Sequence, residues 1–133
     1  MQVKNVYSPG QAALASILGG PLAATWFIRH NYQMQGNEQA ASKTVNIGAF
    51  VVIAVLFSLP LLPSGFPSIL ISLPVIIFTR YFIEQKQFNR QHIDDSEELK
   101  FQPVTNVVAV SLACFCINLA MVFALAMFLV KQG

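Results

Sequence analysis

Long uncharged runs alternate with short polar connections along this chain. Residues 5–28, 44–79 and 101–130 contain no Asp, Glu, Lys or Arg, and most of the charge lies between them. An α-helix needs about 20 apolar residues to cross the hydrocarbon core of a bilayer. The first and last runs are therefore long enough for one crossing each, and the middle run is long enough for two short crossings.

The middle run is divided by a cluster of helix-breaking residues. Between Leu59 and Ser68 the sequence holds Pro60, Pro63, Gly65 and Pro67, which is strong punctuation for a turn. We therefore expect an all-α integral membrane protein whose second and third spans form a tight helical hairpin. Residues 1–133 make one transmembrane domain, and its four predicted helices cover about 8–29, 45–62, 66–83 and 104–130.

Composition supports the assignment to the membrane. Apolar residues make up 55% of the chain and charged residues 11%, whereas a soluble domain usually carries about 25% charged residues. The chain lacks the polar residues that would cover a water-soluble surface. Its formal net charge of +2 is too small to indicate a nucleic-acid partner.

The distribution of Lys and Arg predicts an orientation. With four crossings, the connections 30–44 and 84–103 share one side, and with their flanks they carry six of the eight basic residues. Basic residues concentrate in cytoplasmic connections. Both connections are therefore predicted to be cytoplasmic, in a multi-pass membrane protein.

The first run contains an unfavourable helix interior. Its centre reads SILGGPLAA, residues 16–24, although Gly and Pro destabilise a helix interior by about 1 and 3 kcal/mol. A full crossing is favoured because residues 6–28 would span about 34 Å as a helix. A re-entrant hairpin is the alternative; it would place Lys4 on the basic side and raise the charge asymmetry to seven against one.

Small residues recur through this first run at helical spacing. Such residues let a second helix approach closely, which is a main source of helix association in lipid. The pattern predicts either internal packing or a surface for a partner protein or a second copy. The residues of this predicted face are Ala12, Ser16, Gly19, Gly20, Pro21, Ala23 and Ala24.

The sequence offers little for catalysis or ion transport. Ionisable residues are absent from the centres of the predicted spans, and such residues mark proton and ion paths. Ser111 and Asn118 are candidates for polar contacts between helices, which explain mildly polar spans adequately. Cys114 and Cys116 fit packing in an apolar run, and we expect no catalytic residue, metal site or cofactor.

The first third of the chain resembles a family of small bacterial inner-membrane proteins. The resemblance rests on Tyr7-Ser8-Pro9-x-Gln11, then Leu18 to Ala24, then Asn31-Tyr32 and Gly36, about a quarter of the chain. The family has no established activity, so the resemblance implies a bacterial inner membrane and transfers no catalytic residue.

These observations favour a non-enzymatic membrane protein that acts by helix–helix binding within the bilayer. An accessory subunit or an immunity-type protein would fit, with the lipid bilayer and a membrane protein, or a second copy, as partners. The alternative is a small transporter or channel, acting alone or as an oligomer, and a water-accessible cavity near Asn118 would distinguish it.

Overall fold

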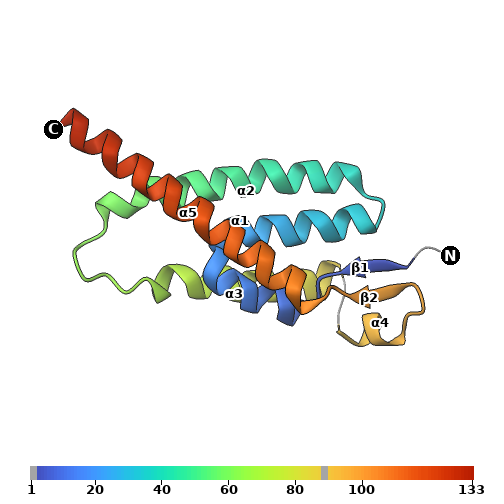
Figure 1. The fold of residues 1–133 in the computed structure, drawn as a ribbon. Coiled ribbons are helices and arrows are strands. Elements are labelled where there is room, and N and C mark those ends of the chain that lie inside the picture. Colours follow the sequence, from blue (N-terminus) through green and yellow to red (C-terminus); the bar gives the residue numbers. More distant parts are fainter. Residues whose placement is uncertain (1–2, 88–89) are drawn as a thin grey trace.

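The computed structural model describes residues 3–87 and 90–133 and is mostly helical (Figure 1). Four long helices dominate, and the 3₁₀ helix η1 (Leu59–Leu61) and the short helix α4 (Arg90–Asp95) lie in the connections. The long helices are α1 (Pro9–Met34), α2 (Glu38–Ser58), α3 (Ile69–Lys86) and α5 (Val104–Gln132). The described residues also form two short strands, β1 (Lys4–Val6) and β2 (Leu99–Phe101), which the all-α prediction missed.

Helix α1 is folded back on itself at its centre. Gly20 has φ 60° and ψ −152°, which lies outside the helical region and divides the helix into a first arm, residues 9–19, and a second arm, residues 21–34. A continuous helix would separate Tyr7 from Asn31 by about 36 Å, yet the Tyr7 amide donates to Asn31 Oδ1 at 2.9 Å. The favoured single crossing by residues 8–29 is therefore wrong, and the hairpin alternative describes the structure.

The α1 hairpin is the centre of the molecule. In the described part of the chain, the extensive helix–helix contacts pair α1 with α2, with α3 and with α5. Helices α2 and α3 run in opposite directions, as the sequence predicted, but the second arm of α1 lies between them (Figure 1). They do not form the expected tight hairpin, because each packs on α1 instead.

The strands join the chain's beginning to the start of α5. They pair in parallel, with Lys4 opposite Leu99 and Val6 opposite Phe101. Each strand leads into a helix, so the first arm of α1 and α5 continue side by side in the same direction (Figure 1). Val6 and Ile93 form a small apolar cluster here, with Met34, Leu99 and Phe101 packed against it.

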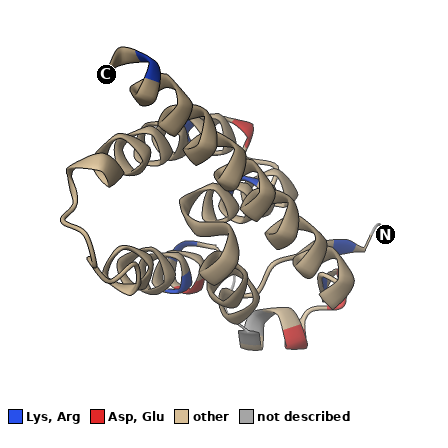
Figure 2. Ribbon diagram, turned by 60° about the vertical axis from the view of Figure 1, so that its left-hand side comes forward, with Lys and Arg blue, Asp and Glu red and all other residues tan. Residues whose placement is uncertain are grey.

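Apolar side chains cover the outside of the helices. Charged residues lie mainly at helix ends and in the connections, and the middles of the long helices are uncharged (Figure 2). Among the described residues, three helices are long and apolar enough to cross a membrane, namely Pro9–Met34, Glu38–Leu61 and Val104–Gln132, and α3 is not one of them. The first of these is the folded α1, so the structure does not confirm four full spans.

Candidate functional site

The small residues of α1 lie inside the protein. Ala12, Ser16 and Ala23 are fully buried, and Gly19 and Ala24 are buried beside them. A Cβ at Gly19 would overlap that of Ala23 and would lie 3.1 Å from the Cβ of Cys114 in α5. These residues therefore bring the two arms and α5 close together and leave little surface for another protein. Gly20 and Pro21, at the tip, are half-buried.

The tip of the hairpin is held by polar side chains. Asn118 Nδ2 donates to the Gly19 carbonyl at 2.8 Å, and Thr25 Oγ1 donates to the Pro21 carbonyl at 2.7 Å. Further down the first arm, Ser111 Oγ donates to the Ala15 carbonyl at 3.0 Å. Backbone groups at a helix break need such partners when no water reaches them. Ser111 and Asn118, which the sequence singled out, thus bind α1 directly.

At the base of the hairpin, the side-chain amide of Asn31 pairs with the backbone amide and carbonyl of one residue, as a neighbouring strand would. Asn31 accepts from the Tyr7 amide and donates to the Tyr7 carbonyl, both at 2.9 Å. The Tyr7 ring packs on Phe27 with centroids 4.4 Å apart, and its hydroxyl donates to Asn106 Oδ1 at 2.5 Å. Burial raises the pKa of Tyr7, so the phenol stays a neutral donor.

Gln11 connects the same base to the start of α5. Ser8 caps α1 in a reciprocal arrangement, in which Ser8 Oγ accepts from the Gln11 amide and Gln11 Oε1 accepts from the Ser8 amide. Gln11 Nε2 then donates to the Gln102 carbonyl at 2.8 Å. The segments Tyr7-Ser8-Pro9-x-Gln11 and Asn31-Tyr32 are therefore parts of one closure, although the sequence assigned no role to Asn31, Gln102 or Asn106.

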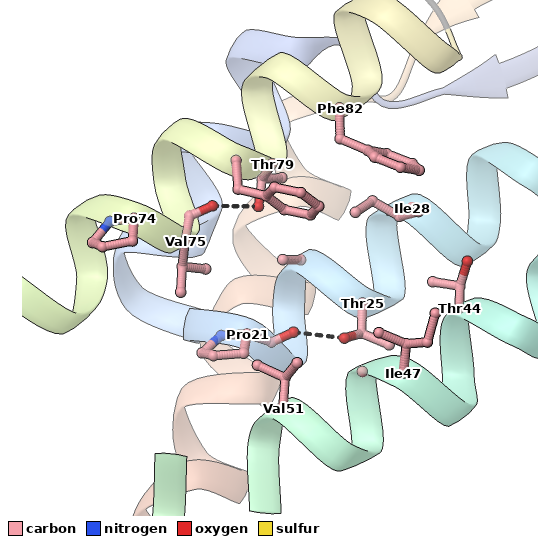
Figure 3. A pocket seen from close by; sticks show the side chains of 13 residues that line it. Pro21, Thr25, Ile28, Thr44, Ile47, Val51, Pro74, Val75, Thr79 and Phe82 are labelled. Atoms are coloured by element: carbon pink, nitrogen blue, oxygen red, sulfur yellow. Dashed lines mark hydrogen bonds between the residues drawn. The ribbon is translucent and has the colours of Figure 1, made fainter. Parts of the chain in front are cut away.

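A groove runs between α2 and α3, with the second arm of α1 as its floor (Figure 3). Its volume is about 350 Å³. The lining residues are uncharged, and the groove extends from the level of Thr44 and Phe82 to that of Pro21 and Pro74. Gly48 lets α2 approach Thr25 closely, because a Cβ at Gly48 would overlap the Thr25 side chain. Sequence reasoning missed this groove because it expected α2 and α3 to touch.

The three threonines of the groove offer it no free hydroxyl donor. Thr25 donates to Pro21, Thr44 to Ala40 at 2.8 Å and Thr79 to Val75 at 2.6 Å, in each case to a backbone carbonyl of the same helix. Figure 3 shows two of these hydrogen bonds beside the open space. The surface is thus apolar, and it suits binding of a hydrocarbon group rather than acid–base chemistry.

A second row of small residues lies on the outside of α5. At 100° per residue its members fall within one narrow stripe, opposite Ser111, Cys114 and Asn118, which face α1. All five are exposed, whereas Cys114 is buried. We call this row the α5 stripe: Ala109, Ala113, Cys116, Ala120 and Ala124. Its spacings of four and three residues are visible in the sequence. The predicted packing face was nevertheless assigned to α1, where small residues recur at the same spacing.

Comparisons with known proteins place no function on these features. The chain matches no protein-family model, no curated protein and no solved structure. Among the residues that the structure describes, no group of three or more His, Cys, Asp or Glu side chains could hold a metal ion. The groove and the α5 stripe are both uncharged surfaces of the described residues.

Proposed function

We propose that the protein is a non-enzymatic integral membrane protein that binds a partner helix within the bilayer through the α5 stripe. The α1 hairpin serves as the scaffold that holds α5 in place. The observation that carries the proposal is the exposure of five small residues in one line on the face of α5 directed away from the protein. Small residues at this spacing allow two helix backbones to approach closely.

The charge distribution supports one orientation of this protein in a bacterial inner membrane. Seven of its eight Lys and Arg residues belong to segments at the end that carries β1, β2 and α4, and Lys131 lies near the far end of α5. The basic end is then cytoplasmic; α2 and α5 cross, the shorter α3 leads the chain back to the cytoplasmic end, and α1 enters and returns. In a cysteine-free background, a membrane-impermeant thiol reagent added outside should label Lys131→Cys and not Lys4→Cys, and the reverse pattern would refute this orientation.

The role as an accessory subunit or an immunity-type protein predicts an association that depends on the stripe. Ala120→Leu places a bulky side chain in the stripe and should reduce co-purification of the partner from native membranes at least about tenfold. Ala126→Leu is the matched control: the same change on an exposed position of α5 about 120° away from the stripe. Equal co-purification with both variants would exclude the stripe as the binding surface.

A second copy of the chain is one partner that this surface would suit. In a symmetric contact between two stripes, the Cys116 side chains lie near each other, within reach of a disulfide if their Cα atoms approach to about 6 Å. Mild oxidation of membranes should then give a dimer in a Cys114→Ala background. A monomer under these conditions, together with a partner lost in Ala120→Leu, identifies the partner as a different protein.

A further inference from the structure

The groove between α2 and α3 has the properties of a lipid site. We propose that it binds one acyl chain of an anionic phospholipid with a hydroxyl-bearing headgroup, taken from the leaflet on the side of β1 and β2. This site is distinct from the α5 stripe and does not depend on the identity of any protein partner. The length of the groove, the chemistry of its walls and the charges at its mouth support this proposal.

The length of the groove fits a hydrocarbon chain within one leaflet. Between Phe82 and Pro74 it follows α3 for eight residues, or about 12 Å. A groove of this length accommodates part of one acyl chain lying along α3. The length is also close to one leaflet, which is about half of a 30 Å hydrocarbon core.

The chemistry of the walls selects an apolar occupant. Val51 and Phe78 line the two sides, and the hydroxyls of the lining threonines donate within their own helices. An occupant with polar groups along its length would leave those groups without partners in a water-excluded space, which is unfavourable. An acyl chain has none.

The mouth of the groove at the basic end carries positive charge. Lys43 lies one turn before Ile47 on α2, and Lys86 lies one turn after Phe82 on α3, so each continues the groove-lining face of its helix. Both lysines are exposed. Glu84, by contrast, lies on another flank of α3, toward the first arm of α1. A headgroup phosphate above the groove therefore meets two ammonium groups.

Gln87, next to Lys86 in the chain, carries a buried acceptor without a partner among the described residues at this end of α3. Its Nε2 donates at 2.9 Å to the carbonyl of Ile28, a residue of the groove floor. Its Oε1 is buried and has no hydrogen-bond partner in the described part of the chain. Buried acceptors are normally satisfied, and a hydroxyl of the headgroup would supply the missing donor.

Native mass spectrometry of the full-length chain tests the site. The protein is released from micelles doped either with phosphatidylglycerol or with phosphatidylcholine of the same acyl chains. We expect one phosphatidylglycerol adduct, at a concentration about tenfold below that needed for phosphatidylcholine. Lys43→Gln with Lys86→Gln should remove this preference, because each lysine near an anionic group strengthens its binding severalfold. Lys100→Gln with Lys131→Gln, an equal change in net charge, should preserve it.

A second pair of variants separates binding in the groove from binding at the surface. Val51→Trp fills the groove and should weaken the adduct about tenfold, while Val130→Trp on the outside of α5 should not. Equal binding of the two lipids by the unmodified chain overturns the proposal, as does an adduct unchanged in both Val51→Trp and the Lys43/Lys86 pair. A dimer lost in Val51→Trp would assign the groove to a second copy instead. None of these outcomes alters the test of the α5 stripe.

Discussion

Helices α1 and α5 both carry rows of small residues, but the fold uses the two rows differently. In α1 the row is buried, and Gly19 lies against Ala23 and Cys114. In α5 the row is exposed, and Ala113 and Ala120 face away from the protein. The same spacing therefore serves internal packing in one helix and remains open for a partner in the other. A pattern of small residues identifies a face suited to close contact and does not tell which neighbour makes it.

The two helices also differ in how they satisfy their backbone. Helix α5 is continuous, and its backbone hydrogen bonds form within the helix. Its side chains Ser111 and Asn118 donate to backbone carbonyls of α1. Helix α1 is broken at Gly20 and depends on those bonds and on the closure by Asn31. A re-entrant hairpin is stable in a membrane only when protein surrounds its tip, and here α2, α3 and α5 all pack on it.

The largest expected effect comes from opening the base of the hairpin. Asn31→Leu removes both hydrogen bonds to Tyr7 and leaves a buried amide and a buried carbonyl unpaired. Each unpaired group costs about 1–3 kcal/mol, so the free energy of unfolding should fall by about 2–6 kcal/mol. Unfolding by an SDS titration, followed by circular dichroism, measures this change.

The matched control for this substitution lies in α2. Asn46→Leu makes the same chemical change at an exposed position, and we expect a change within about 0.5 kcal/mol. If Asn31→Leu were no more destabilising than Asn46→Leu, the hydrogen bonds at this base would not hold the two arms of α1 together. The difference between α1, which depends on side-chain hydrogen bonds, and the continuous helix α5 would then be refuted.

Part of this fold could be predicted from the sequence. The uncharged runs and the polar connections gave the positions of α2, α3 and α5 to within a few residues at most ends, because charge and proline constrain each segment locally. The excess of apolar residues predicted the apolar outer faces that the structure has. These features depend on one segment at a time.

The rest depends on pairs of distant segments and could not be read in the same way. By its length, α1 could cross the membrane as one helix. The hydrogen bonds of Asn118 at its tip and of Asn31 at its base hold it instead as a hairpin, and these contacts join residues far apart in the sequence. Likewise, α2 and α3 follow each other in sequence, yet the returning second arm of α1 separates them and creates the groove. The short sheet was missed because three-residue strands such as Lys4–Val6 carry almost no periodic signal.

The smallest expected change in the free energy of unfolding comes from substitutions of small residues, at buried positions in α1 and at exposed positions in α1 and α5. Gly19→Ala adds one methyl group where Ala23 and Cys114 leave no space, and overpacking of this kind costs about 1–3 kcal/mol. Gly10→Ala, in the first turn of the same helix, meets no atom within 4 Å and should be neutral or slightly stabilising, because alanine favours helix more than glycine. Ala120→Leu in the α5 stripe should leave the free energy of unfolding unchanged while it disrupts partner binding.

The three variants are measured in the same SDS titration. A loss of stability that is confined to Gly19→Ala supports internal packing of the small residues in α1 and an open surface on α5. A comparable loss in Ala120→Leu would show instead that the stripe already packs within the folded chain.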